Sequence, residues 1–302
     1  MTQLSSQLSL SDDPFDLVNE SAYLVWRNNK LNDAKPEAAD LLVKVANPYQ
    51  LTPDELCAIT ERCHRYNMAI YQLQDIQLQD KSLVHDLGEQ LGLSRLDANL
   101  RSDEDSVSSL QVRDQVGNQY IPYTNKALSW HTDGYYNPLE KQIYGIIMHC
   151  VNPADSGGVN ALMNPEAVYI ALRDKNPAYI AALMHPQAMT IPDNVEDGKV
   201  IRAAQTGPVF IIKEPVGSKP GRLHMRFSAR KRNIIWRDNE ETKQAVAMMN
   251  DLMADDSMVT KVALKQGQGI VCNNVLHNRT SFEDSETQKR LMYRARYYDA
   301  VG

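Results

Sequence analysis

The sequence predicts an α+β fold in which strands make up most of the second half of the chain. Helical patterns come first, between residues 51 and 91, and strand-like apolar runs begin near residue 109. Further helical stretches interrupt these runs at 165–173, 178–184 and 240–253. Helices followed by many antiparallel-looking strands with inserted helices indicate a barrel or sandwich with helical additions.

The first element is a helix that begins at Pro53. Thr52 can cap it, proline suits the first helical position, and the two acidic residues that follow complement the positive end of the helix dipole. The apolar run 68–73 predicts a strand, and a second helix is expected over 82–91. Later strands are expected at 109–112, 143–151, 208–213, 223–227, 262–271 and 291–298, and the helix at 240–253 has Asp238 or Asn239 as its cap.

The 302 residues fit a single domain, with 1–14 as a loose leader and 51–298 as the core. A net charge of −6 gives no reason to expect a nucleic-acid partner. The N-terminus lacks the features of a signal peptide, and no apolar run reaches the roughly 18 residues of a membrane helix, so a cytoplasmic protein without a membrane partner is expected. A homo-oligomer stays open. No CxxC pair occurs, so free thiols are expected at Cys57, Cys63, Cys150 and Cys272.

A candidate metal motif is Trp130-His131-Thr132-Asp133. Residues two apart in an extended segment point to the same side, so His131 and Asp133 can bind one ion together. Alone, the pair is weak evidence, because chance pairs are expected in a chain with 7 histidines and 38 acidic residues.

A second candidate is His277, which follows the strand-like run 269–272 and the turn-forming residues Asn273 and Asn274. Loops at strand ends often carry function, although a surface histidine is the simpler interpretation of this segment by itself. A sheet that closes on itself can bring His277 close to His131. The other histidines have no partner spacing and are interpreted as structural or surface residues: His64, His85, His149 and His185.

Arginines repeat along the run 289–296. As a strand, it places Arg290, Arg294 and Arg296 on one face, and buried guanidinium groups need anionic partners. A carboxylate is the partner that the planar guanidinium binds best, but an outward-facing edge strand explains this segment equally well. The run 222–227 places Arg222, His224 and Arg226 on one face, which is interpreted as solvated rather than anion-binding.

Together these signals predict two histidines and one carboxylate on a metal, with a carboxylate-binding arginine beyond the second histidine. This ligand set leaves three octahedral positions open, as in non-haem Fe(II) oxygenases. A zinc hydrolase with the same ligands and a non-catalytic barrel that senses or binds a ligand are the alternatives. A hydrolase has no use for Arg290 and Arg294, and a binding module has no use for metal ligands.

The chain resembles the taurine-dioxygenase-like (TauD/TfdA-like) 2-oxoglutarate oxygenases. The resemblance rests on WHTD at 130–133, SGGVNAL at 156–162 and NNVLH…KRLMYRAR at 273–296, with LTPDELCAITERCHRYNMAIYQL at 51–73 similar to the helix-then-strand opening of the family. It implies a double-stranded β-helix (jelly-roll) core with a helical N-terminal part and inserted helices, within one catalytic domain.

The resemblance also implies site roles. It implies that His131, Asp133 and His277 bind iron(II) and that Arg290 binds the far carboxylate of 2-oxoglutarate. Asn160 stands where the family usually has a threonine that contacts 2-oxoglutarate. Arg294 takes the position of an arginine that faces the substrate, and the substrate pocket is expected to include Tyr135, Tyr136 and Asn137. The implied reaction uses O₂ to convert 2-oxoglutarate to succinate and CO₂ and hydroxylates a C–H bond of a small, anionic metabolite. Halogenating relatives lack the metal carboxylate, so Asp133 favours hydroxylation.

Overall fold

The fold is described by a computed structural model, which covers residues 13–32, 35–98, 106–112, 121–213, 221–230 and 234–302. Apart from Asp13 and Pro14, the expected leader lies outside the described residues. The helices are α1 (Glu20–Leu31), α2 (Pro53–Tyr66), α3 (Leu83–Gln90), α4 (Pro165–Lys175), α5 (Pro177–Leu183) and α6 (Glu240–Ala254). Within the described part of the chain, no helix combines the length and apolar character of a membrane span.

Six strands form the larger sheet, in the order β1 (Leu42–Val45), β2 (Met68–Leu73), β16 (Gln268–Cys272), β5 (Gly145–Asn152), β19 (Leu291–Tyr297) and β3 (Ser108–Leu110). Neighbouring strands are antiparallel except for β1 and β2. The arginine-rich strand β19 lies between β5 and β3, so the edge-strand interpretation is wrong.

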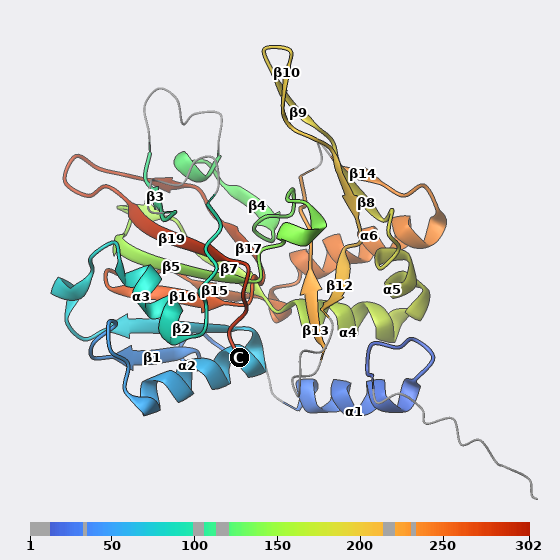
Figure 1. The fold of residues 1–302 in the computed structure, drawn as a ribbon, viewed down its shortest axis with the longest axis horizontal. Coiled ribbons are helices and arrows are strands. Elements are labelled where there is room, and N and C mark those ends of the chain that lie inside the picture. Colours follow the sequence, from blue (N-terminus) through green and yellow to red (C-terminus); the bar gives the residue numbers. More distant parts are fainter. Residues whose placement is uncertain (1–12, 33–34, 99–105, 113–120, 214–220, 231–233) are drawn as a thin grey trace, which may run out of the picture.

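Helices α2 and α3 cover one face of this sheet (Figure 1). Helix α2 begins as predicted, because Thr52 and Glu55 form a reciprocal capping box, and it ends at Asn67, whose φ of 60° turns the chain into β2. Residues of α2, α3 and the sheet share a buried apolar cluster that includes Ile59, Leu87 and Val271.

Four strands form a second sheet, in the order β15 (Thr260–Val262), β7 (Asn160–Met163), β17 (Leu276–Arg279) and β4 (Leu128–His131). A second buried cluster contains residues of both sheets, among them Leu162 of β7, Ile270 of β16 and Met292 of β19. The two sheets therefore pack against each other through apolar side chains.

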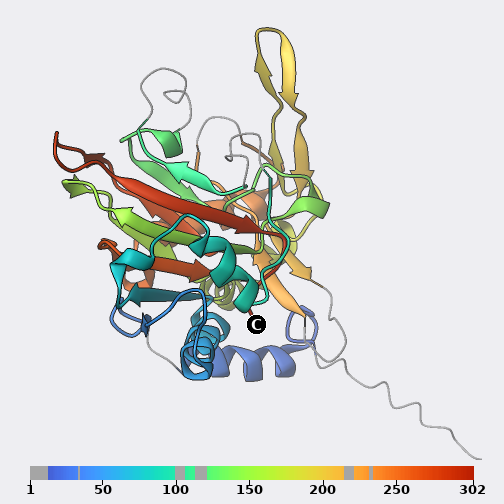
Figure 2. The same cartoon turned by 60° about the vertical axis from the view of Figure 1, so that its left-hand side comes forward.

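Helices α1, α4, α5 and α6 lie together beyond the end of the second sheet, around a third apolar cluster (Figures 1 and 2). With them are the three-stranded sheet β11 (Gln205–Gly207), β8 (Met189–Ile191) and β14 (Ile235–Trp236), and the pair β12 (Phe210–Lys213) and β13 (Arg222–Met225). The hairpin of β9 (Asn194–Glu196) and β10 (Lys199–Arg202) projects from the body in both views, and β6 (Ser156–Gly157) pairs with β18 (Phe282–Glu283).

Two predictions about elements are wrong. The run 262–271 is not one strand, because a turn at Gly267, with φ of 77°, separates β15 from β16, and these strands belong to different sheets. The face of Arg222, His224 and Arg226 is not solvated, because His224 is 4% and Arg226 0% exposed. The Arg226 guanidinium instead donates to the backbone carbonyls of Met189, Gly207 and Gln205.

The remaining element predictions differ from the structure mainly at their ends. Helix α6 begins after Asn239, although that side chain makes no capping hydrogen bond. The cysteines are free, as predicted, and Cys57 is the one of the four that is exposed.

Candidate metal centre and its cavity

The pairing of β4 with β17 brings the two candidate histidines together. His277 is directly opposite His131 in the antiparallel register, and their ring centroids lie 4.3 Å apart. Asp133 lies in the turn that follows β4, and its Oδ1 is 3.5 Å from His131 Nε2. One potential ligand atom from each of the three residues lies within 4.8 Å of the others. The distant segments therefore converge as the sequence predicted.

A backbone carbonyl orients each imidazole. His131 Nδ1 is 2.9 Å from the carbonyl oxygen of Ser129, and His277 Nδ1 is 2.8 Å from that of Val275. A carbonyl oxygen only accepts hydrogen bonds, so Nδ1 carries the proton in both rings and Nε2 keeps its lone pair for a ligand. Such outer partners fix the tautomer of metal-binding histidines.

The local electrostatics also suit a metal site. Burial works to raise the pKa of Asp133, but the Arg294 guanidinium, together with the neighbouring His131 and Arg296, holds this pKa well below its usual value. Burial, with the neighbouring His131, lowers the pKa of His277 to about 4. At neutral pH the site thus presents an ionised carboxylate and a neutral imidazole, which are the forms that bind metal ions. The donor set fits a divalent transition metal.

Asn274 joins the two segments that carry the candidate ligands through its side chain. Its Oδ1 accepts from the backbone N–H of Asp133 at 2.8 Å, and its Nδ2 donates to the carbonyl oxygens of Asp133 at 2.9 Å and Ile143 at 2.6 Å. Asn274 is 1% exposed and has a φ of 49°, a conformation that asparagine tolerates better than most residues. It therefore fixes the turn of Asp133 relative to the strand of His277.

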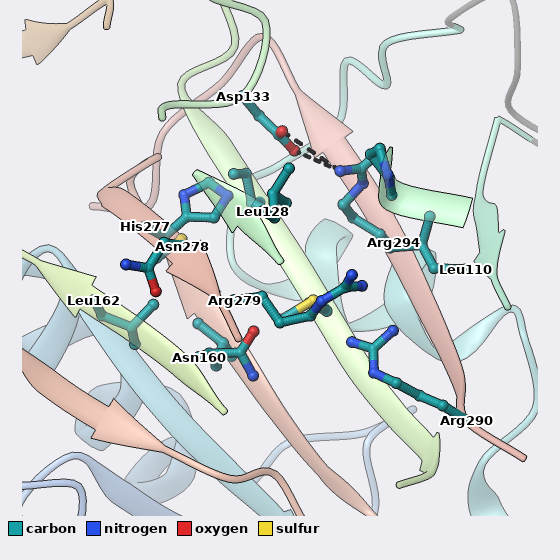
Figure 3. Close-up of a pocket in the computed structure, with 15 residues that line it drawn as sticks. Leu110, Leu128, Asp133, Asn160, Leu162, His277, Asn278, Arg279, Arg290 and Arg294 are labelled. Carbon is teal, nitrogen blue, oxygen red and sulfur yellow. Dashed lines mark hydrogen bonds and ion pairs between the residues drawn. The ribbon is translucent and has the colours of Figure 1, made fainter. Parts of the chain in front are cut away.

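A cavity between the two sheets opens beside these ligands (Figure 3). Asp133 and His277 line one end, and Asn160, Arg279 and Arg290 line it further on. The remaining lining residues are mostly apolar: Leu110, Pro122, Leu128, Ile146, Met148, Leu162, Ile270, Cys272, Asn278 and Arg294. An apolar cavity with a few convergent polar groups is typical of a small-molecule site.

Two buried arginines give this cavity a positive end. Arg279 and Arg290 are 5% and 4% exposed, and both guanidinium groups lie near the ring of Phe282, at 4.8 and 5.1 Å from its centroid. Burial lowers the pKa of each to about 10, so both stay charged at neutral pH. Arg279 donates to the carbonyl oxygens of Thr124 and Lys126. The described residues offer Arg290 no carboxylate within 4 Å, so its guanidinium is available to an anion.

Arg294 lies closer to the ligand cluster than Arg290 does. Its Nη1 is 3.2 Å from Asp133 Oδ2, and the two side chains are 12% and 6% exposed. Arg296 also points inward and donates to Tyr136 Oη and to Asp97. The prediction that arginines on the inner face of this strand have anionic partners is confirmed for Arg294 and Arg296.

The three expected substrate residues after Asp133 lie outside the lining of this cavity. The Tyr135 ring meets the edge of the His131 ring at a centroid distance of 6.4 Å. Tyr136 Oη accepts the hydrogen bond from Arg296, and Asn137 Nδ2 donates to the carbonyl oxygen of Lys141. Their role in substrate binding stays a prediction.

Arg279, Asn274 and Asp97 are structural parts of the site that the sequence did not single out for these roles. Asn274 was noticed only as a turn residue, and its clamp on Asp133 depends on sheet register. Arg279 stands two residues after His277, which places it on the same side of β17 and was the one available signal. Asp97 carries no motif.

Comparisons with known proteins agree with this geometry. Residues 31–296 match the model of the family described as "Taurine catabolism dioxygenase TauD, TfdA family". A uridine-5'-phosphate dioxygenase from an Amycolatopsis species is 27% identical over 177 residues, 57% of this chain and 61% of that enzyme. A uridine-5'-phosphate dioxygenase from a Streptomyces species is 26% identical over 213 residues, 67% of this chain and 73% of that enzyme. The chain thus spans less than two thirds of the Amycolatopsis relative.

Among solved structures, the non-heme iron oxygenase OrfP, in complex with Fe, succinate and (3R,4R)-dihydroxy-L-Arg, superposes with a TM-score of 0.63 at 14% identity. The match covers 83% of this chain and 82% of OrfP, and at this identity it shows a shared fold. The family match extends over most of the chain and includes every segment of the ligand cluster. The chain therefore belongs to the TauD/TfdA family of Fe(II)- and 2-oxoglutarate-dependent dioxygenases.

Proposed function

We propose that His131, Asp133 and His277 hold one Fe(II) ion and that the cavity beside them receives 2-oxoglutarate. The observation that carries this proposal is the direct pairing of the two histidines across β4 and β17, with Asp133 beside them and both Nε2 lone pairs available. The far carboxylate of 2-oxoglutarate is assigned to Arg290, which is buried, charged and without a carboxylate partner among the described residues. Asn160, at the start of β7 and 6% exposed, lines the same end.

The protein groups have separate tasks in this reaction. Bound iron supplies the oxidative chemistry that converts 2-oxoglutarate and O₂ to succinate and CO₂ and hydroxylates a substrate C–H bond. The carbonyls of Ser129 and Val275 orient the imidazoles, and Asn274 fixes the carboxylate. The apolar wall of the cavity, with residues such as Leu162 and Ile270, excludes water from the reacting groups.

The substrate class follows from the charges around the ligand cluster and from the relatives. Arg294 faces Asp133 from within the cavity lining and is assigned to an anionic group of a small metabolite. Both relatives above are named as dioxygenases of uridine 5'-phosphate. We therefore propose a phosphorylated or otherwise anionic small molecule, with uridine 5'-phosphate as the first compound to test. Tyr135, Tyr136 and Asn137 are proposed to border it.

The test is succinate formation by the purified protein with Fe(II), 2-oxoglutarate and O₂. Uridine 5'-phosphate is expected to raise the rate above the substrate-free value, and uridine, which lacks the phosphate, is the matched control. His277→Ala is expected to abolish turnover. An absence of succinate with a broad panel of anionic metabolites, together with tight retention of zinc, would contradict the proposal and favour a hydrolase.

The remaining assignments complete this proposal. The two packed sheets are assigned to a double-stranded β-helix core, and residues 1–302 to one catalytic domain. A cytoplasmic location is proposed, and self-association stays open. Neither the hydrolase nor the non-catalytic barrel gains support from the family match.

A further inference from the structure

The contact between Arg294 and Asp133 involves both carboxylate oxygens. Arg294 Nη1 lies 3.2 Å from Oδ2 and 3.4 Å from Oδ1 of Asp133, as the dashed lines in Figure 3 show. Oδ1 is also the oxygen that lies 3.5 Å from His131 Nε2. The guanidinium therefore contacts the same carboxylate oxygen that lies toward His131, on the side where an ion shared with the histidines would bind.

Arg294 and Arg296 differ in the partners that hold them. Arg296 is 4% exposed and is fixed by both Asp97 and Tyr136 Oη. For the Arg294 guanidinium, the described residues provide Asp133 alone, and Arg294 Nε has no hydrogen-bond partner among them. Arg294 also lines the cavity. Of the two arginines that reach the turn after β4, Arg294 is the one that can exchange its partner.

We propose that Arg294 and the divalent ion compete for Asp133, and that an oxyanion bound by Arg294 strengthens metal binding. This inference rests on the proposed function, because it assumes that Asp133 is a metal ligand. A carboxylate, sulfonate or phosphate group can accept hydrogen bonds from the guanidinium that now donates to Asp133 Oδ1. Once the anion holds Arg294, both oxygens of Asp133 are free to face the ion.

The competition has a charge component and a contact component. A guanidinium within hydrogen-bonding distance of a ligand oxygen repels an incoming dication and withdraws electron density from that oxygen. By linkage, the factor by which the anion strengthens metal binding equals the factor by which the metal strengthens anion binding. An anionic substrate would thus complete the site on which it is oxidised.

Titration calorimetry of the full chain with Co(II), without 2-oxoglutarate, tests this inference. The dissociation constant is measured with and without sulfate at constant ionic strength, with chloride as the balancing salt. In the wild type, sulfate is expected to lower the constant for Co(II) by roughly 5- to 100-fold. In Arg294→Gln the constant is expected to be lower from the start, by a similar factor, and insensitive to sulfate.

Arg202→Gln is the matched control. Arg202 lies 5.8 Å from the ring centroid of Tyr136, near the same turn, but donates to the carbonyls of Pro192 and Ala203 rather than to Asp133. This variant loses the same charge and is expected to behave as the wild type does. A response equal to that of Arg294→Gln would show a general charge effect and overturn the contact argument.

Two further outcomes would overturn the inference: no sulfate effect in the wild type, or weaker Co(II) binding in Arg294→Gln. If Arg294→Gln lacks a cooperative urea transition, the wild-type sulfate titration decides alone. Failure of the proposed function is distinguishable, because then Asp133→Asn would leave Co(II) affinity unchanged whatever sulfate does.

Discussion

Substitution of Asn274 by alanine tests whether the metal centre depends on the clamp between its two ligand segments. The change removes three hydrogen bonds, to the N–H and C=O of Asp133 and to the C=O of Ile143. A net loss of about 1 kcal/mol per bond gives about 3 kcal/mol, because these backbone groups are buried. Alanine at a φ of 49° adds about 1 kcal/mol of backbone strain. The expected loss is about 4 kcal/mol of unfolding free energy.

Urea unfolding measures this loss, and Asn274→Gly separates its two causes. Glycine removes the same bonds but adopts a positive φ without strain, so Asn274→Gly is expected to be about 1 kcal/mol more stable than Asn274→Ala. Both variants are also expected to bind Fe(II) more weakly, because the turn of Asp133 loses its anchor. A loss below about 1 kcal/mol in Asn274→Ala, with unchanged metal affinity, would refute the clamp.

Three other predictions concern the co-substrate, pH and a tight turn. Arg290→Gln is expected to raise the 2-oxoglutarate concentration needed for half-maximal turnover about 30-fold or more, which is the equivalent of about 2 kcal/mol or more for a charge-assisted pair. Unchanged co-substrate affinity would remove Arg290 from this role. Burial lowers the pKa of His149 to about 4, below the roughly 6.5 of an unfolded chain, so the unfolded state binds more protons between these values. The contribution of neutral His149 to the unfolding free energy is therefore fully present above pH 6.5 and is lost as the pH falls toward 4. In urea unfolding from pH 6.5 to 5, the unfolding free energy of His149→Asn is expected to fall less steeply than that of the wild type. Parallel curves would contradict this. Gly157→Ala is expected to lower the melting temperature more than Gly158→Ala. Both glycines have a positive φ, but a Cβ at Gly157 would lie 2.3 Å from a backbone oxygen, whereas the atom nearest to a Cβ at Gly158 would be 3.6 Å away. Equal losses of melting temperature would show that packing has no part.

The three residues of the proposed metal cluster could be picked out from the sequence because each belongs to a short motif. His131 and Asp133 stand two apart, and His277 follows a strand and a turn, so residue type and spacing carried most of the information. The start of helix α2 was likewise predictable, because the Thr52 side chain caps a residue only three positions further on. Such features depend on a few neighbouring residues.

Features that depend on long-range packing were not predictable in the same way. Asn274 holds Asp133 only because β4 and β17 pair in one register, which no local pattern specifies. The break at Gly267 lay inside an apolar run that reads as one strand. Arg226 was assigned to a solvated face, yet three backbone carbonyls bind it inside the fold. Alternation gives a shared face but does not say whether that face is inward.

The most direct test of the account is the amount of Fe(II) bound per chain under anaerobic conditions. The wild type is expected to bind one ion, and single alanine substitutions of His131, Asp133 and His277 are each expected to lose it while the urea transition stays cooperative. Retention of Fe(II) by the folded His277→Ala variant at wild-type affinity would contradict a shared ion between β4 and β17.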